Sequence, residues 1–407
     1  MFFRKRRKEI SYSLQRIAWG KFKKNKLSMA GLIFIILAFI VSISGYLLTP
    51  DTTPNCNRQI LELATKKPGF TVDMLLVRKN IPSERKNFFR RMFTGEQSPY
   101  NFIPLNSWYF DGDKVIAEEF NELEEEKFLS EWDIADVVFP LQYGQESQSK
   151  GNTITFTDIY ENQHTINIPD LYETISNEHI KRYRFILGTD RFGRDMLSRL
   201  LIGTRISLSV GFISVFISLL IGITLGALAG YFRGVTDNII MWLINVIWSI
   251  PTLLMVIAIT LVLGKGFWQI FIAVGLTMWV EVARVVRGQV LSLREKEYVE
   301  AGRALGFSDI RILFHHILPN AMSPVIIISA ANFSSAILIE AGLSFLGIGV
   351  QPPVSSWGSM IRDHYGYIIV DLAYLAVTPG IAIMLLVLSI TIVGNGLRDA
   401  LDTRSVG

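Results

Sequence analysis

The stretch ISLSVGFISVFISLLIGITLGALAGY, residues 206–231, decides the fold class of this chain. It contains no charged residue and lies between Arg205 and Arg233. An α-helix needs about 20 predominantly apolar residues to cross the hydrocarbon core of a bilayer, so the stretch predicts a membrane-spanning helix. Small residues at four-residue spacing on this helix favour close approach of another helix backbone. They are Gly222, Gly226 and Gly230.

Further apolar stretches of similar length lie on both sides of this one. They are residues 27–48, residues 239–263, a stretch from Phe267 that carries Glu281 and Arg284 toward its end, residues 322–346, and residues 372–396. Hydrophobic residues make up 50% of the 407-residue chain, which is typical of a membrane protein rather than of a soluble enzyme. We therefore predict an all-α polytopic membrane protein with about six transmembrane helices.

The N-terminal segment, residues 1–26, is strongly basic and is followed directly by an apolar span. A nucleic-acid-binding patch is the alternative interpretation, but Lys and Arg beside a span usually mark its cytoplasmic side. With this segment in the cytoplasm, Arg233, residues 284–311 and Arg398 fall on the same side, and both termini are cytoplasmic. The first span, residues 27–48, is too long and too late for a cleaved signal peptide, so we expect a retained anchor.

A polar insertion, residues 49–185, follows the first span and contains no apolar run of membrane-spanning length. We expect a small soluble α+β domain on the extracytoplasmic side. Helix formers without a breaker predict a helix at 117–132, and alternating residues predict strands at 152–160 and 163–168. Residues 144–152 are typical of an exposed loop.

The insertion offers no pattern of metal ligands. Cys56 is the only cysteine of the chain, which excludes an internal disulfide framework and a Cys-rich metal site. His164 and His179 lie near acidic residues without the spacing of metal ligands, so we interpret them as surface residues and predict no metal.

The polar stretch EYVEAGRALGFSDIRILFHHILPN, residues 297–320, separates the fourth and fifth predicted spans. Its pattern predicts two short helices, 300–305 and 310–318, broken at Gly306. Because the stretch is long and polar, we expect this helix-turn-helix to lie beside the membrane on the cytoplasmic side.

The second of these helices has recognisable ends and an apolar face. Ser308 or Asp309 is expected to cap its start, and Pro319 is expected to end it. An amphipathic helix of this kind suits a groove in a partner protein. The apolar face consists of Ile310, Leu313, Phe314, Ile317 and Leu318.

Two parts of the sequence resemble a known protein family. In the polar stretch, EAG at 300–302, Gly306 and ILP at 317–319 look like the EAA loop of ABC importer membrane subunits, although Gly302 stands where that loop often has alanine. The block LGTDRFGRD, residues 187–195, resembles the C-type permease subunit of dipeptide and oligopeptide importers. The resemblance extends over about residues 185–402 and the short stretch KNKL at 24–27, and it does not include the insertion.

The resemblance implies a fold and a division of labour. The expected fold is that of type I ABC importers, with a permease core at 186–402 and a short tail at 403–407. The implied function is to form half of the pathway for di- or oligopeptides across a bacterial cytoplasmic (inner) membrane. The implied partners are a second homologous permease, two ATPase subunits that use ATP and Mg²⁺, an extracytoplasmic solute-binding protein and membrane lipid. No nucleic acid, and no cofactor bound by this chain, is implied.

In this family the EAA loop docks on the ATPase. The resemblance therefore assigns the coupling loop to Glu300, Ala301, Gly302, Gly306, Ile310, Leu313, Ile317, Leu318 and Pro319. The family motif before the second span comprises Gly188, Thr189, Asp190, Gly193, Arg194 and Asp195.

Several polar residues allow more than one interpretation. Asp190 and Asp195 suggest a cation site, but a helix cap made by Thr189 or Asp190 is the favoured alternative. Ionised groups in or beside spans usually face a cavity or a partner. Such groups here are Glu281, Arg284 and Glu340, which either contact the transported solute or form structural ion pairs with other subunits.

Motifs of other function classes are absent from the sequence. There is no GxxxxGK[ST] phosphate loop, no HExxH zinc pair and no GxSxG elbow, so we expect a transport subunit rather than an enzyme. Two alternatives remain. One is an ion-coupled secondary transporter, and the other is a membrane-anchored sensor whose insertion binds a ligand.

Overall fold

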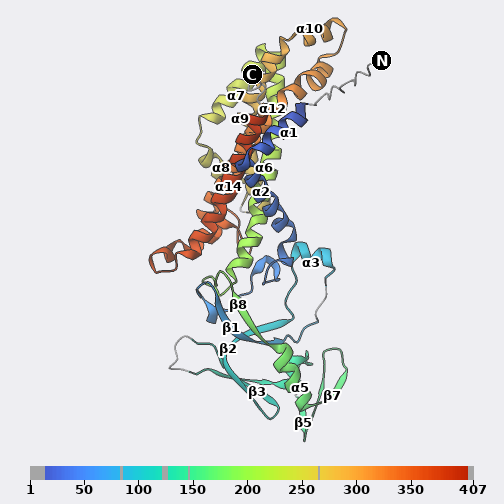
Figure 1. Cartoon of the computed structure of the whole chain (residues 1–407), viewed down its shortest axis with the longest axis vertical. Helices are drawn as coiled ribbons and strands as arrows, with labels where there is room; N and C mark the ends of the chain where they lie inside the picture. Colours follow the sequence, from blue (N-terminus) through green and yellow to red (C-terminus); the bar gives the residue numbers. More distant parts are fainter. Residues whose placement is uncertain (1–13, 83–85, 122–126, 145–146, 265, 402–407) are drawn as a thin grey trace, which may run out of the picture.

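The computed structural model describes residues 14–82, 86–121, 127–144, 147–264 and 266–401. The molecule is elongated, with helices along most of its length and the β-strands gathered at one end (Figure 1). Helices α1 (Leu14–Lys24) and α10 (Glu297–Ala304) lie at the opposite end, together with the C-terminal end of α14 (Tyr374–Leu401).

Five helices in the described part of the chain are long and apolar enough to cross a membrane, and a bent helix pair would make a sixth crossing. This agrees with the prediction of a mostly helical chain with about six spans. The five are α2 (Lys26–Ser44, continued by a 3-10 helix, Gly45–Leu47), α6 (Met196–Phe232), α9 (Phe267–Arg294), α12 (Leu318–Phe345) and α14. Between the last two, α13 (Trp357–His364) and a 3-10 helix, Tyr365–Ile369, form the connection.

The third predicted span, 239–263, is not one straight helix. It is divided into α7 (Gly234–Trp248) and α8 (Thr252–Leu263), whose axes differ by 92°. Pro251 stands at the break, where its ring and its missing N–H prevent a continuous α-helix. Asp237 near the start of α7 accepts two hydrogen bonds from the Arg287 guanidinium of α9, at 2.5 and 2.7 Å.

The small-residue face of α6 packs against α9, as the spacing of its glycines predicts. A Cβ atom at Gly226 would lie only 2.4 Å from the carbonyl oxygen of Ala283. One at Gly222 would lie 2.5 Å from the Cβ of Val282. Only glycine therefore permits this approach, and the contact lies within the chain itself.

The insertion contains two antiparallel sheets. The larger has the strand order β4-β3-β2-β1-β8, and the smaller has the order β5-β6-β7. The strands are β1 (Phe70–Arg78), β2 (Tyr100–Asp111), β3 (Lys114–Glu119), β4 (Leu129–Asp133), β5 (Gln148–Lys150), β6 (Thr153–Thr157), β7 (Gln163–Asn167) and β8 (Ile180–Phe185). The helical elements are Pro54–Cys56, Leu61–Leu63, α3 (Phe88–Thr94), α4 (Ile134–Val138), α5 (Ile168–Thr174) and a π-helix, Ile175–His179.

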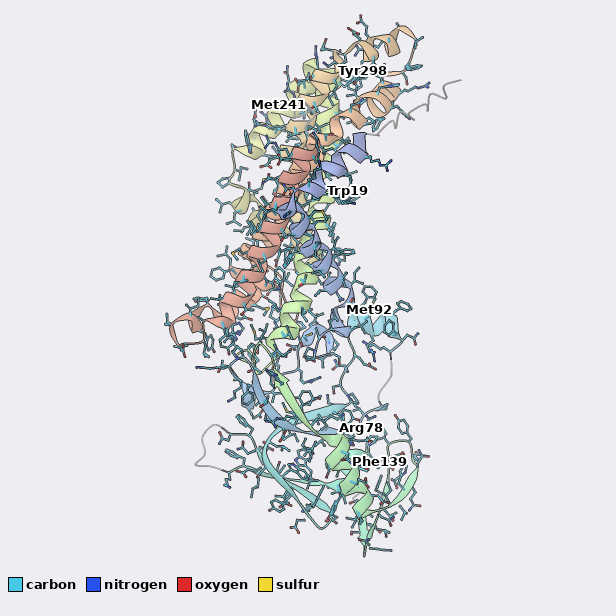
Figure 2. All side chains as sticks on the ribbon, in the orientation of Figure 1. Trp19, Arg78, Met92, Phe139, Met241 and Tyr298 are labelled. Atoms are coloured by element: carbon cyan, nitrogen blue, oxygen red, sulfur yellow. The ribbon has the colours of Figure 1, made fainter. Side chains whose placement is uncertain are left out.

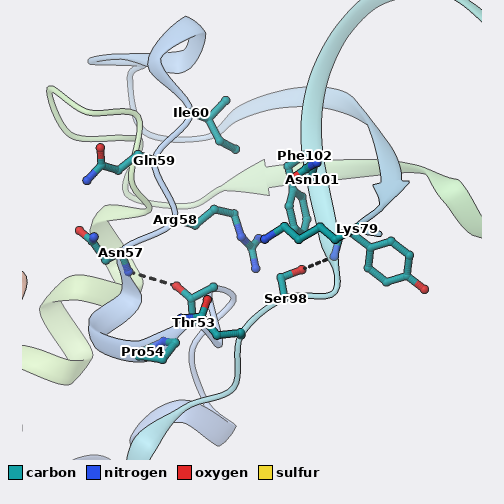
Figure 3. A pocket seen from close by; sticks show the side chains of 12 residues that line it. Thr53, Pro54, Asn57, Arg58, Gln59, Ile60, Lys79, Ser98, Asn101 and Phe102 are labelled. Carbon is teal, nitrogen blue, oxygen red and sulfur yellow. Dashed lines mark hydrogen bonds between the residues drawn. The ribbon is translucent and has the colours of Figure 1, made fainter. Parts of the chain in front are cut away.

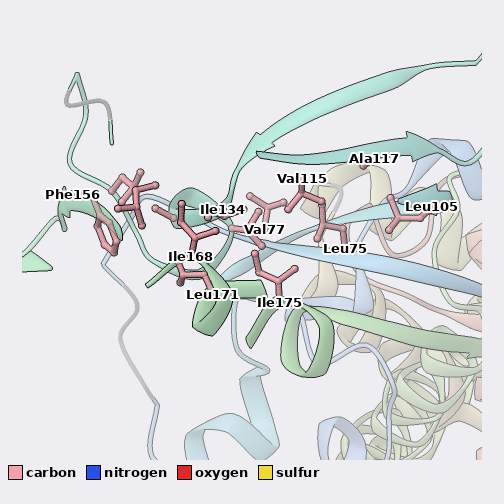
Figure 4. Packing of buried hydrophobic residues seen from close by; sticks show 14 residues of the cluster. Leu75, Val77, Leu105, Val115, Ala117, Ile134, Phe156, Ile168, Leu171 and Ile175 are labelled. Atoms are coloured by element: carbon pink, nitrogen blue, oxygen red, sulfur yellow. The ribbon is translucent and has the colours of Figure 1, made fainter. Parts of the chain in front are cut away.

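A hydrophobic core of its own supports this α+β insertion. Apolar side chains of the larger sheet, such as Leu75 and Val115, pack against α4 and α5 through Ile134 and Leu171 (Figure 4). Burial of each such side chain contributes about 1.5–3 kcal/mol to the free energy of folding.

Three predictions for the insertion need correction. The helix predicted at 117–132 is wrong, because the segment enters β3 and β4 on either side of residues 122–126, which lie outside the described residues. Ala117 is completely buried between neighbouring strands, so sheet packing outweighs helix propensity there.

The loop predicted at 144–152 includes strand β5, although residues 145–146 lie outside the described residues. His179 is buried rather than on the surface, and its Nδ1 lies 2.7 Å from the Leu76 carbonyl oxygen. The strands predicted at 152–160 and 163–168 are confirmed as β6 and β7.

Candidate functional site

The helix-turn-helix at 297–320 lies at the end of the molecule opposite the insertion, where Figure 2 labels Tyr298. Its first helix, α10, ends in a left-handed turn at Gly306, whose φ is +77°. The Gly306 N–H donates to the Arg303 carbonyl at 2.9 Å, and the Phe307 N–H donates to the Gly302 carbonyl at 3.1 Å. These two bonds form a Schellman motif, which explains why glycine stands at this position.

The second helix differs from the prediction at its C-terminal end. Ser308 caps its start by accepting a hydrogen bond from the Arg311 N–H, as expected. However, α11 (Asp309–Arg311) and a π-helix (Ile312–Ile317) continue without a break into α12. Pro319 lies where the π-helix passes into α12, at a point where the regular α-helical hydrogen bonding is already altered, and so it does not end the helix.

The predicted apolar face of this helix divides into two sides. Leu313, Ile317 and Leu318 are buried within the chain, where they pack with Tyr231 of α6 and Val286 of α9. These three residues are therefore not available to a partner, contrary to the prediction.

The side that is left exposed is apolar. Ile310 and Phe314 were predicted to belong to it, and Leu305 was not. Ile310 is 70% exposed and Phe314 is 58% exposed, while Leu305 at the end of α10 is 73% exposed. Glu300 and Ala301 lie exposed on α10. We call Leu305, Ile310 and Phe314 the outer face of the loop.

Replacement by alanine is expected to have opposite effects on the stability of α10 at the two glycines of the loop. Gly306→Ala places a Cβ in a left-handed conformation at a cost of about 1–2 kcal/mol, although no atom lies within 4 Å of that position. Gly302→Ala puts a Cβ at 3.5 Å from Phe307, an ordinary contact, and raises helix stability by about 0.5–1 kcal/mol. Hydrogen exchange of the α10 amides should become faster in the first variant and slower in the second. Equal rates in both variants would contradict the role of the turn.

The motif at 188–195 forms a buried junction between the insertion and α6. The Asp190 carboxylate accepts hydrogen bonds from the Phe192 N–H at 2.8 Å, the Arg194 N–H at 3.0 Å and the Arg194 Nε at 2.6 Å. The Arg199 Nε lies 3.6 Å from the same carboxylate. Asp190 is completely buried, so it neutralises two buried guanidinium groups rather than offering a free cation ligand.

The other motif residues connect neighbouring segments. The Thr189 hydroxyl donates to the Leu63 carbonyl and accepts from the Lys66 N–H at 2.8 Å. A Cβ at Gly193 would lie 1.6 Å from the Ile60 carbonyl oxygen, and one at Gly188 would lie 2.2 Å from that of Lys66.

The helix cap of α6 is made by a different residue from those predicted. Asp195 accepts a hydrogen bond from the Ser198 N–H at 2.7 Å, whereas Thr189 and Asp190 do not cap. The Ser198 hydroxyl in turn accepts from the Asp51 N–H at 3.0 Å, which ties the exit of the first span to this junction.

The three charged residues of the spans lie in different surroundings. Glu281 is exposed and lines a hollow of about 330 Å³ between α7, α8, α9 and α12. Arg284 stacks on Trp248 at 3.5 Å and donates to Asn245 at 3.0 Å. Glu340 is completely buried within its own chain, where Ser344 donates to it at 2.6 Å, so its position contradicts an ion pair with another subunit.

Sequence reasoning missed a polar pocket of about 340 Å³ in the insertion (Figure 3). Arg58 and Lys79 contribute positive charge to its lining, and Arg58 also stacks on Phe102 at 3.7 Å. Pairing of β1 with β2 places Lys79 near Phe102, whereas Arg58 comes from the segment before β1, so no local motif indicated the pocket.

Comparison with known proteins gives the family. Residues 222–406 match the family described as binding-protein-dependent transport system inner membrane component, and residues 13–64 match the N-terminal TM domain of oligopeptide transport permease C. The di/tripeptide transport system permease protein of Pseudomonas aeruginosa is 44% identical over 222 residues, 54% of this chain and 73% of that protein. The chain belongs to this permease family. It is accordingly a multi-pass membrane subunit of an ABC importer and is not itself an enzyme.

Other relatives of this permease are also permease proteins of transport systems. The glutathione transport system permease protein of Pectobacterium atrosepticum is 41% identical over 54% of this chain and 72% of that protein. The oligopeptide transport system permease protein of Bacillus subtilis is 42% identical over 53% and 71%, respectively. Among solved structures, an inward-facing methionine ABC transporter matches with a TM-score of 0.43 and 20% identity, covering 51% of this permease and 98% of that chain. Neither family match includes residues 65–221.

Proposed function

We propose that this permease forms half of a translocation pathway for peptides and is driven by a separate ATPase that binds the outer face of the loop. A second homologous permease forms the other half, and two ATPase subunits bind ATP and Mg²⁺. An extracytoplasmic binding protein delivers the solute. The proposal of a peptide rests on the relatives, which transport di- and tripeptides, oligopeptides and glutathione.

The observation that carries this proposal is the exposed apolar surface on an otherwise polar loop. Leu305, Ile310 and Phe314 are all more than half exposed. Exposed apolar groups at the polar end of a membrane protein are typical of a binding surface for another protein. The buried side of the same helix packs on α6 and α9, so force applied at the outer face reaches the spans directly.

We propose that both termini and this loop are cytoplasmic and that the insertion is extracytoplasmic. The basic residues beside α1 and α10 support this orientation, because Lys and Arg near spans favour the cytoplasmic side. The placement of the loop at the end opposite the sheets is consistent with it (Figure 1). Glu281 would then face the pathway from the hollow between α7, α8, α9 and α12, and the junction at 188–195 would lie at the outer mouth of the pathway.

The test is purification of the full complex and reconstitution in nanodiscs with its binding protein. We expect two ATPase chains to accompany the permease, and ATP hydrolysis to increase when a di- or oligopeptide is added. A sugar serves as the control solute and should leave hydrolysis unchanged. A complex that lacks ATPase chains, or one that is stimulated by the sugar and not by peptides, would overturn the proposal.

A further inference from the structure

Helix α3, with the sequence FFRRMFT, has two chemically different faces. At 100° per residue, Phe88, Met92, Phe89 and Phe93 fall within one arc of about 140°, and the two arginines fall on the opposite side. The phenylalanines are exposed to unusual degrees, 55% for Phe88, 72% for Phe89 and 52% for Phe93. Exposed aromatic side chains gathered in this way indicate a surface that is covered in the working protein.

The helix is fixed at the end of the first span. The Arg205 guanidinium of α6 donates to the Phe93 carbonyl at 2.7 Å and to the Ser42 carbonyl at 2.9 Å, so one side chain joins α3 to α2. Gly95, directly after α3, approaches so closely that a Cβ there would lie 2.7 Å from the Thr52 carbonyl oxygen. Figure 1 shows α3 beside the lower end of α2, and Figure 2 labels Met92 there.

The apolar face of α3 continues the lipid-facing surface of the first span. The last turns of that span expose Ile43, Leu47 and Leu48 by 38%, 39% and 50%, next to the segment on which α3 packs. An apolar surface that begins on a membrane span and extends onto a neighbouring helix is most simply covered by the same lipid. The arginines on the opposite face, Arg90 and Arg91, are both exposed and complement lipid phosphates in charge.

We propose that α3 is an interfacial anchor that binds phospholipid in the leaflet on the side of the insertion. Phe88, Phe89 and Phe93 enter the boundary between headgroups and acyl chains, and Arg90 and Arg91 contact the phosphates. The anchor holds the insertion at a fixed height above the bilayer. This inference depends on α2 spanning the membrane and is independent of the transported solute.

Site-directed spin labelling of the full-length permease in nanodiscs tests this anchor. The only cysteine, Cys56, is completely buried, so a nitroxide on Phe89→Cys reports from a single position. Collisions with oxygen, which concentrates in lipid, are compared with collisions with a water-soluble nickel chelate. We expect the label at 89 to favour oxygen over nickel by several-fold relative to a label on Arg91→Cys, the matched position on the polar face.

Two further labels set the scale for this measurement. Leu37→Cys lies in the middle of α2 and is 54% exposed, and Tyr109→Cys lies on β2 and is 55% exposed. Because Phe89 is proposed to lie at the boundary between headgroups and acyl chains, the ratio of oxygen to nickel collisions at 89 should fall between the ratios at 37 and 109. A label at 89 that resembles the one at 109 would overturn the anchor, since the helix would then lie in water. Protection from both reagents would also overturn it, because it would indicate a protein partner in place of lipid.

Discussion

Replacement of Asp190 by alanine is expected to destabilise the permease by about 3–5 kcal/mol, the range typical of breaking a buried ion pair from one side. The substitution removes three hydrogen bonds and leaves the guanidinium groups of Arg194 and Arg199 buried without their counter-ion. These two side chains are only 6% and 4% exposed, so water cannot replace the carboxylate. The measurement is the thermal midpoint of the purified protein in detergent, together with the yield of monodisperse material.

Two further variants separate charge from hydrogen bonding. Asp190→Asn keeps an oxygen acceptor for the backbone N–H groups but loses the charge, so its stability should fall between those of the native protein and Asp190→Ala. Glu131→Ala removes an exposed ion pair with Lys114 and should leave the thermal midpoint nearly unchanged. If Asp190→Ala proved as mild as Glu131→Ala, the junction would not depend on its buried charges.

Replacement of Ile310 by glutamate is expected to uncouple the permease from its ATPase without unfolding it. Ile310 is 70% exposed, so a charged side chain there meets water in the isolated chain. In the complex it would be desolvated at an apolar contact, and loss of such a contact typically costs about 2 kcal/mol or more, roughly 30-fold in affinity. The measurement is the amount of ATPase retained on the immobilised permease, with peptide uptake as the second readout.

The matched control for this variant is Leu313→Glu on the opposite side of the same helix. Leu313 is only 4% exposed and packs against α6 and α9, so glutamate there should lower the yield of folded protein. Ile310→Glu should leave the yield unchanged. Loss of folding in both variants, or full ATPase binding by Ile310→Glu, would contradict the assignment of the outer face.

The membrane-spanning helices were predictable because lipid imposes a length and a composition that can be read directly from the sequence. The left-handed turn at Gly306 and the cap at Ser308 were also predictable, since both depend on local backbone chemistry. The bend at Pro251 was overlooked, although a proline inside an apolar run is a local signal for one.

Other features depend on contacts that no local pattern contains. The apolar residues of the helical segment 309–317 look alike in sequence, and only the folded chain separates buried Ile317 from exposed Ile310. The segment around Ala117 has helix formers, yet it is a strand because strands on both sides bind it. Asp190 neutralises two buried arginines. One of them, Arg199, lies in α6 and outside the motif at 188–195, so the motif alone did not reveal this ion pair.

The uninterrupted helix from Asp309 to Phe345 has a mechanical consequence. At 1.5 Å per residue its 37 residues form a rod of about 55 Å, which is longer than the membrane is thick. If the ATPase binds the outer face of the loop, as proposed, a tilt imposed there would travel toward the far end through the π-helical turn at Ile312–Ile317 and past Pro324. The π-helical turn and Pro324 are both points where the regular α-helical hydrogen bonding is interrupted, so stiffening either should alter how much of such a tilt arrives at the far end.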